Sequence, residues 1–414
     1  MTTAERQRNA AQLLRPQLPA ELTDKRAGCP FDPATGLTEL SGRGGIHRVE
    51  HNGDSVWLVT GHDEARAVLA APQMSSDRIN SPRAKALISP ELHAEMFPPE
   101  RRAGSFIFMD APEHTRFRRL LTGQFTVRRM RDLTPRVHEI VTGCLDAMVE
   151  KGPPADLVHD FALPVPSLVI CELLGVDYGD RDEFQRRTSK LLSLTTTVDE
   201  QIENATEMRR FMRELVEEKQ RDPGDDLLSG LVRDTDLTTD ELVGIANLLL
   251  IAGHETTANM LALGTFALLE HPAELEKLRA DPGLVENAVE ELLRYLSIIS
   301  AGVSRHARED VEIGGVTVRA GETVVVSVPA VNRDERQYDD PHALLLDRPR
   351  GHHVAFGHGI HQCLGQQLAR VEMAVGFTEL LRRLPSLQLA VPAHEVPLRT
   401  DMSIYGVHRL PVTW

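Results

Sequence analysis

The sequence predicts a mainly helical protein that carries small β-sheets. Apolar residues recur at helical spacing from about Glu113 to Arg383, which is most of the chain. The exception lies at 311–329. There, two short runs rich in β-branched residues flank Gly314-Gly315, the pattern of a β-hairpin, and 323–328 is an almost continuous apolar run typical of a buried strand.

The elements before the helical region are shorter. Residues 1–45 are rich in proline, glycine and charge, and predict an irregular lead-in. The run 56–60 predicts a strand, and the residues after it predict a helix through Ala70. Prolines and charges in 72–105 predict a loop with short helices. The chain end at 404–412 again has an extended pattern.

A long helix is predicted in the second half of the chain. Thr238 and Glu241 form a capping box, and the periodic pattern runs to Leu268, a length of about 48 Å at 1.5 Å per residue. Thr256 follows Ala252 by four residues, so its hydroxyl can bond that carbonyl and loosen the helix. The small residues at 252 and 253 would leave room for a bulky group.

Composition excludes several classes of protein. The formal net charge of −15 argues against nucleic acid as the main partner. The first six residues lack the apolar stretch of a signal peptide, and no later apolar run has the length of a membrane span. The four cysteines are dispersed and form no CxxC pair. We therefore expect a cytoplasmic protein with no disulfide framework.

The stretch from Phe356 to Gly365 is FGHGIHQCLG, and it places Cys363 before a helix expected from Leu364 to about Arg383. A thiolate near a helix N-terminus is favoured because free N–H groups and the helix dipole face it. The two glycines that precede the cysteine would let the loop pass close to a flat ligand. A single thiolate presented in this way suits a haem iron that needs one strong axial donor.

The pattern Phe-Gly-x-Gly-x-His-x-Cys-Leu-Gly resembles the haem-binding loop of the cytochrome P-450 monooxygenases at every fixed position. The resemblance implies one triangular, helix-rich domain over residues 1–414, with a sheet-rich part at about 45–110 and a helical part at about 111–414. This replaces the two or three domains that length alone would suggest. No internal repeat or low-complexity linker divides the chain.

The resemblance also implies roles for individual residues. Cys363 would bind the iron of haem b. Glu255 and Thr256 would be the acid and the alcohol that deliver protons during dioxygen activation, with Glu255 standing where many relatives have Asp. The other residues that would hold the cofactor and its propionates are His114, Arg118, Ala252, Arg305, Phe356, Gly357, His361 and Gly365.

Glu291 and Arg294 share one helix face at a spacing of three residues. They predict an exposed local pair or, by resemblance, a buried pair that braces the cysteine side of the haem together with an upstream arginine. Arg348 and Arg350 are both candidates for that arginine. Four histidines near Cys363 allow an alternative metal cluster such as zinc, although no second cysteine completes a tetrahedral set; they are His352, His353, His358 and His361.

The sequence contains no dinucleotide fingerprint, so the two electrons that a monooxygenase needs must come from another protein. We expect a ferredoxin and a ferredoxin reductase. A local basic cluster could dock the acidic ferredoxin, with a solvated helix face as the alternative interpretation. The cluster consists of Arg116, Arg118, Arg119, Arg128, Arg129 and Arg131.

The segments 252–259 and 405–414 resemble in particular an actinomycete group that hydroxylates macrolides, statins, vitamin D and xenobiotics. We therefore expect a monomeric monooxygenase that uses O2 to hydroxylate a bulky apolar small molecule. The alternatives are a peroxygenase, a dehydratase, a nitric oxide reductase, or a haem-based sensor or ligand-binding protein. The pocket would draw on five segments, namely 72–105, 175–200, 248–256, 298–303 and 402–404.

Overall fold

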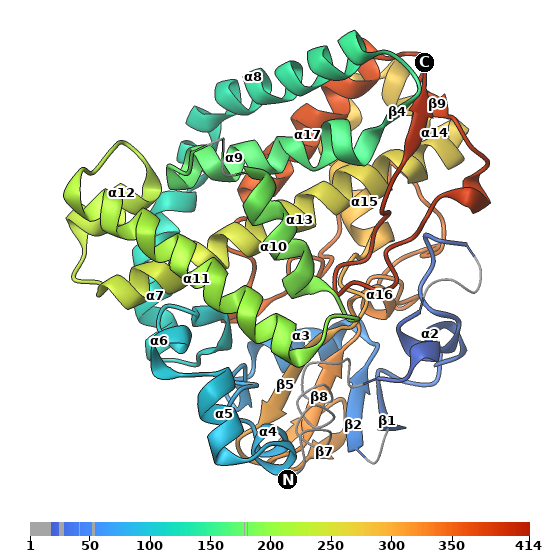
Figure 1. Ribbon diagram of the computed structural model, residues 1–414. Helices are drawn as coiled ribbons and strands as arrows, with labels where there is room; N and C mark the ends of the chain where they lie inside the picture. Colours follow the sequence, from blue (N-terminus) through green and yellow to red (C-terminus); the bar gives the residue numbers. More distant parts are fainter. Residues whose placement is uncertain (1–17, 25–28, 41, 52–53, 178, 180) are drawn as a thin grey trace.

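The computed structural model describes residues 18–24, 29–40, 42–51, 54–177, 179 and 181–414. Helices fill the upper part of the molecule in Figure 1, and the larger sheet closes its lower part. The predicted fold class, mainly helical with small sheets, is confirmed. Residues 1–17, 25–28 and 41 of the predicted irregular lead-in lie outside the described residues, and part of the remainder, at 35–40, is helical rather than irregular.

The α-helices follow the sequence prediction closely where the apolar pattern is long. The capping box at Thr238 opens the central helix, which ends at Glu270. The helices are α2 (Thr35–Leu40), α3 (His62–Ala70), α4 (Pro82–Leu87), α5 (Pro90–Met96), α6 (Pro99–Arg102), α7 (Glu113–Thr122), α8 (Val127–Lys151), α9 (Pro164–Leu174), α10 (Arg181–Leu192), α11 (Val198–Arg221), α12 (Leu227–Asp234), α13 (Thr239–Glu270), α14 (Pro272–Ala280), α15 (Val285–Leu296), α16 (Val328–Val331) and α17 (Gln366–Arg383).

The larger sheet joins segments that are far apart in the sequence. Its order is β1-β2-β8-β5-β3, with β2 parallel to β8 and the other neighbours antiparallel. The predicted hairpin is present as β6-β7, and both of its turn glycines have positive φ. The strands are β1 (Ile46–His51), β2 (Asp54–Val59), β3 (Met74–Ser75), β4 (Ala155–Asp156), β5 (Val303–Ala307), β6 (Val311–Ile313), β7 (Val316–Val318), β8 (Thr323–Val326), β9 (Gln388–Leu389) and β10 (Pro411–Thr413).

Helix α13 is the centre of the packing. It contacts α9, α11, α15 and α17, and it crosses the middle of the molecule in Figure 1. Most of its residues are buried, including Phe266. A helix that is apolar on all sides must be buried on all sides, which is why this one has neighbours around its circumference.

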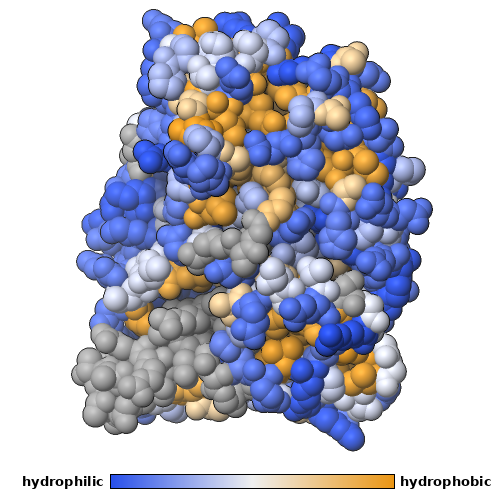
Figure 2. Space-filling view, turned by 90° about the vertical axis from the view of Figure 1, so that its right-hand side faces the viewer, coloured by the Kyte–Doolittle hydropathy of each residue, from blue (hydrophilic) through white to orange (hydrophobic). Residues whose placement is uncertain are grey.

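Outside the core, the molecule presents a mixed surface. On the face shown in Figure 2, apolar side chains form several separate patches between hydrophilic ones. None of the described helices combines the length and the hydropathy needed to cross a bilayer. The extended pattern predicted for the chain end yields only the short strand β10.

Candidate active site

The loop that carries Cys363 runs from Phe356 to Gly365 and leads into α17. The Cys363 N–H donates to the Phe356 carbonyl at 2.8 Å and closes the turn. Gly357 and Gly359 have φ values of 70° and 73°, where other residues are strained. A Cβ atom at Gly359 would also lie 2.4 Å from the carbonyl oxygen of Leu69. The loop therefore packs directly against the end of α3.

Cys363 is half-buried, and burial raises the pKa of its thiol. The Gly365 amide, Arg118 and Arg370 act in the opposite direction without outweighing burial. The Gly365 amide at the start of α17 therefore favours the thiolate, as expected, but burial has the larger effect on the pKa of Cys363. A metal cation displaces the proton of a coordinating thiol, so the site suits ligation rather than a free nucleophile.

His114 and His361 meet beside this loop. Their ring centroids are 4.0 Å apart. His114 Nδ1 and His361 Nε2 are buried, and neither has a hydrogen-bond partner among the described residues. Burial, together with the charges of His114 and Arg305, lowers the pKa of His361 to about 3. Buried polar atoms normally have partners, so this pair of rings is incomplete without a ligand.

Arg305 and Arg118 lie at the same place. Arg305 on β5 is 8% exposed, and its guanidinium donates to the Ser304 carbonyl. Burial lowers the pKa of Arg305 to about 10 and also lowers that of Arg118. The carboxylate of Asp110 is occupied by hydrogen bonds from the Ser75 hydroxyl and the Ser76 amide, at 2.5 and 2.8 Å.

The structure thus brings together all four residues predicted to bind propionates. The nearby carboxylate of Asp110 already accepts hydrogen bonds from Ser75 and Ser76, so it is not free to serve as their partner. Uncompensated buried charge is unfavourable. A group that brings two carboxylates would supply partners for His114, Arg118, Arg305 and His361. The residues present therefore fit a haem.

The middle of α13 is open on one side. Ala252 is exposed although the helix around it is buried, and the Thr256 hydroxyl donates to the Ala252 carbonyl at 2.9 Å, as predicted. Gly253 has a different role from the one expected. A Cβ atom there would lie 2.9 Å from Ile170 Cδ1, so this glycine allows close packing of α9. Of the two small residues, only Ala252 faces free space.

Glu255 has a partner that the sequence did not reveal. Its carboxylate is 3% exposed and accepts a hydrogen bond from Arg399 at 2.9 Å. Asn259, one turn further along α13, donates to the Glu255 carbonyl at 2.7 Å. Arg399 stands 144 residues away in the chain-end segment, and no local pattern marks it. The acid is therefore held in a buried ion pair rather than exposed to solvent.

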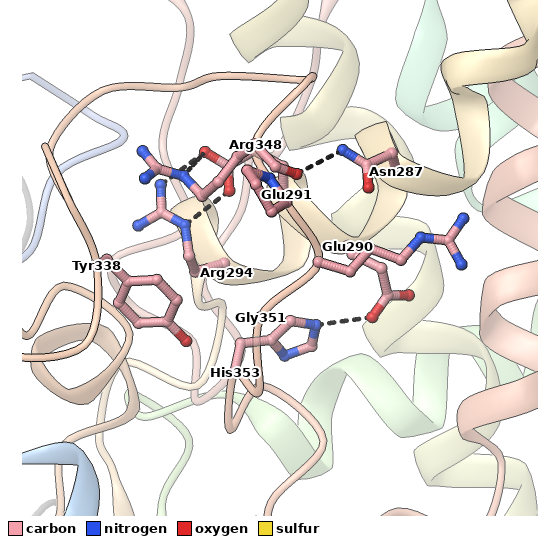
Figure 3. A pocket seen from close by; sticks show the side chains of 10 residues that line it. Asn287, Glu290, Glu291, Arg294, Tyr338, Arg348, Gly351 and His353 are labelled. Carbon is pink, nitrogen blue, oxygen red and sulfur yellow. Dashed lines mark hydrogen bonds and ion pairs between the residues drawn. The ribbon is translucent and has the colours of Figure 1, made fainter.

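Figure 3 shows two arginines converging on Glu291. Arg294 donates to both carboxylate oxygens at 2.7 Å, and Arg348 donates at 3.1 Å. Arg350 instead pairs with Glu286 at the surface. The structure therefore places Arg348, not Arg350, with the pair. A pocket of about 10 Å³ beside them has room for about one water molecule, so this is a scaffold rather than a substrate site.

Glu290, the neighbour of this cluster, connects two helices. It accepts hydrogen bonds from His353 at 3.0 Å and from Arg370 of α17 at 2.6 Å. Burial opposes its ionisation, but these two partners lower the pKa of Glu290 to about 2. The ion pair fastens α15 to the helix that follows Cys363. Within the described ranges, no three His, Cys, Asp or Glu side chains form a metal cluster, so the zinc alternative gains no support.

The predicted pocket segments meet in space. The Ser403 hydroxyl donates to the Leu192 carbonyl at 2.6 Å, and the Tyr405 amide donates to the Ile298 carbonyl at 2.9 Å. Phe184 on α10 contacts the His254 ring on α13, with centroids 5.4 Å apart. Side chains from α4, α5 and α11 pack together as well. Segments that are distant in the sequence and predicted to form the pocket are therefore in contact with one another.

The basic cluster separates into two kinds of residue. Arg116 pairs with Glu241, and Arg118 is partly buried and interacts electrostatically with Cys363. The remaining members are exposed on α7 and the start of α8, and the structure gives their guanidinium groups no acidic partner among the described residues. They are Arg119, Arg128, Arg129 and Arg131. Because His114 of α7 contacts His361, this basic surface lies beside the cysteine loop.

Comparison with known proteins agrees with this geometry. The family model described as cytochrome P450 matches residues 184–402. Pentalenic acid synthase of Streptomyces avermitilis is 47% identical over 392 residues, covering 93% of this chain and 95% of that protein. The chain belongs to the cytochrome P450 family. Vitamin D3 dihydroxylase of Streptomyces griseolus is 43% identical and covers 93% of this cytochrome P450 and 95% of its own length.

Solved structures extend the similarity to the fold. The crystal structure of Rif16 is 53% identical, with a TM-score of 0.82, and covers 96% of this chain and 100% of that one. The complex of CYP105P1 with filipin I is 41% identical, with a TM-score of 0.87, and covers 94% and 97%. This cytochrome P450 is a haem-thiolate monooxygenase that acts on a small molecule and receives electrons from redox partners. The predicted family, fold and reaction class are confirmed.

Proposed function

We propose that Cys363 ligates haem b and that the enzyme hydroxylates a bulky, largely apolar small molecule with electrons from a ferredoxin. The observation that carries the proposal is a group of side chains beside the cysteine loop. His114 Nδ1 and His361 Nε2 lack hydrogen-bond partners among the described residues, and the buried Arg305 guanidinium donates to a carbonyl rather than to a carboxylate. Relatives named for pentalenic acid and vitamin D3 support the substrate class. When bound, haem supplies the chemistry that activates dioxygen and transfers one oxygen atom.

The residues of this chain bind and orient the cofactor and deliver protons. Cys363 presents one sulfur from a fixed turn, and the four propionate partners set the orientation of the cofactor. Ala252 leaves the space that a flat group requires. The Thr256 hydroxyl, anchored on the Ala252 carbonyl, still has acceptor capacity to hold a water molecule. Glu255 is the adjacent acid that passes protons to that water. This intact pair argues against a peroxygenase.

An optical titration of the purified enzyme tests the proposal. The ligand panel comprises macrolides, terpenoids, steroids and statins, and the carbon monoxide spectrum of the reduced protein is recorded on the same sample. A thiolate-type band with a high-spin shift for one ligand class is expected. A histidine-type band, or the absence of haem, would reject Cys363 as the ligand.

Arg399 is expected to act as a positioning residue for proton delivery. In Arg399→Gln, Glu255 loses its ion pair, and the ratio of product formed to electrons consumed should fall about tenfold, within the range of general acid–base effects. Peroxide release and the solvent isotope effect on turnover should rise. Arg399→Lys should recover part of the coupling. The control is Arg409→Gln, at an exposed position of the same segment, which should leave the ratio of product to electrons unchanged. If Arg399→Gln also leaves this ratio unchanged, the positioning role of Arg399 is rejected.

The exposed basic residues of α7 and α8 are expected to dock the ferredoxin. The double variant Arg128→Glu/Arg131→Glu should lower the rate of ferredoxin-supported reduction about tenfold at low salt and flatten its salt dependence, because opposite charges steer association. Stopped-flow reduction measures both effects. Arg210→Glu, at an exposed position of α11, is the control. Equal rates in the double variant and the control would assign the cluster to a solvated helix face.

A further inference from the structure

Arg78 lies next to the candidate active site and has no role in the function proposed above. It follows β3, whose Ser75 pairs in register with His306, the neighbour of Arg305. Its backbone is fixed, since the Arg78 amide donates to the Ser76 carbonyl at 2.8 Å and the Arg78 carbonyl accepts from the Ser81 hydroxyl at 2.9 Å. The side chain therefore projects from a defined turn close to Arg305.

The guanidinium of Arg78 is accessible, and it lies in the region of Arg305 and Phe108. Burial nevertheless lowers its pKa. Neighbouring protein therefore lies close to the group but leaves part of it accessible. Cys363 likewise keeps some accessible area although burial shifts its pKa. The charge of Arg78 also lowers the pKa of Arg305, which places the two guanidinium groups in the same region.

Arg78 lacks an acidic partner in the part of the chain that the structure describes. Its guanidinium lies over the ring of Phe108, 5.0 Å from the centroid. The two nearby acids are engaged elsewhere. Asp77 accepts hydrogen bonds from Asn80, and Asp110 accepts them from Ser75 and Ser76. A partly buried cation that is left unpaired is unfavourable unless a ligand supplies the anion.

We propose that Arg78 is the anion-binding contact of the substrate chamber, where it binds the carboxylate of a substrate that is otherwise apolar. The planar guanidinium matches a carboxylate in a bidentate geometry, and the Phe108 ring offers an apolar surface beside it. The inference rests on the proposed function, because it requires haem and substrate to share the space near Cys363. The propionates of haem already have four partners in His114, Arg118, Arg305 and His361.

Matched acid and ester pairs test the inference by binding rather than turnover. The probes are dehydroabietic acid with its methyl ester and lauric acid with its methyl ester, measured on haem-loaded enzyme by optical titration and equilibrium dialysis. In the wild type, at least one acid should bind about tenfold more tightly than its ester, as a charged hydrogen bond allows. Arg78→Gln should remove that preference and change ester affinity by less than about twofold, while Arg78→Lys should keep part of it.

Arg308→Gln is the matched control, because this arginine is exposed on the same sheet edge and bonds the Pro72 carbonyl. It should retain the full acid preference. The inference is overturned if neither acid outbinds its ester in the wild type, or if Arg78→Gln keeps the preference. Loss of haem from Arg78→Gln with the preference intact would assign Arg78 to a propionate instead. A wild-type enzyme without a thiolate band would reject the proposed function itself, which separates the two failures.

Discussion

Replacing Cys363 with histidine is expected to abolish the thiolate-type carbon monoxide band of the reduced enzyme and to lower ferredoxin-supported hydroxylation to background. The loop geometry that presents residue 363 depends on Gly357, Gly359 and backbone hydrogen bonds, so the variant should fold. An imidazole at this position can still bind iron, but it lacks the electron donation that makes a thiolate favour O–O cleavage. The spectrum should therefore change to the histidine type while haem remains bound.

Cys29→Ser provides the control for this change. Cys29 is exposed and far in sequence from the cysteine loop, so its removal should leave both the spectrum and turnover intact. Optical spectra of the reduced carbon monoxide complexes and product analysis measure the two outcomes. A thiolate band that survives in Cys363→His, or one that disappears in Cys29→Ser, would show that another residue is the ligand.

Local sequence patterns predict the parts of the site that depend on residues close together in the chain. The capping box at Thr238 and the apolar run after it define α13, and the glycines of the cysteine loop are required by positive φ and close packing. The bond from Thr256 to Ala252 follows from a spacing of four residues. Each of these depends on neighbours in the chain, so a pattern in the sequence is sufficient.

The parts that sequence does not predict depend on contacts between distant segments. Arg399 reaches Glu255 only because the chain end folds back onto α13. Strands β3, β4 and β9 contain two residues each and exist through their partners rather than through propensity. The raised pKa of Cys363 is a consequence of burial, which no motif encodes. The choice between Arg348 and Arg350 likewise depends on which side chain turns inward.

Glu291→Ala is expected to be the most destabilising single substitution considered for this enzyme. It would remove the carboxylate that neutralises Arg294 and Arg348 in the interior, where Glu291 is 3% and Arg294 is 2% exposed. Breaking a buried ion pair by removing one partner costs about 3–5 kcal/mol. The free energy of unfolding of a protein is only about 5–15 kcal/mol. The variant should therefore unfold at a much lower denaturant concentration and retain little haem. Urea unfolding followed by circular dichroism and haem absorbance measures both.

Glu286→Ala separates this effect from a general weakening of α15. Glu286 lies on the same helix and also pairs with an arginine, Arg350, but the two side chains are 72% and 56% exposed. Solvent-exposed pairs contribute about 0–1 kcal/mol, so this variant should unfold almost as the wild type does. Equal destabilisation by Glu286→Ala and Glu291→Ala would mean that helix content, not the buried triad, governs stability. A large difference would show that α15 stabilises the fold through the two arginines that Glu291 holds together.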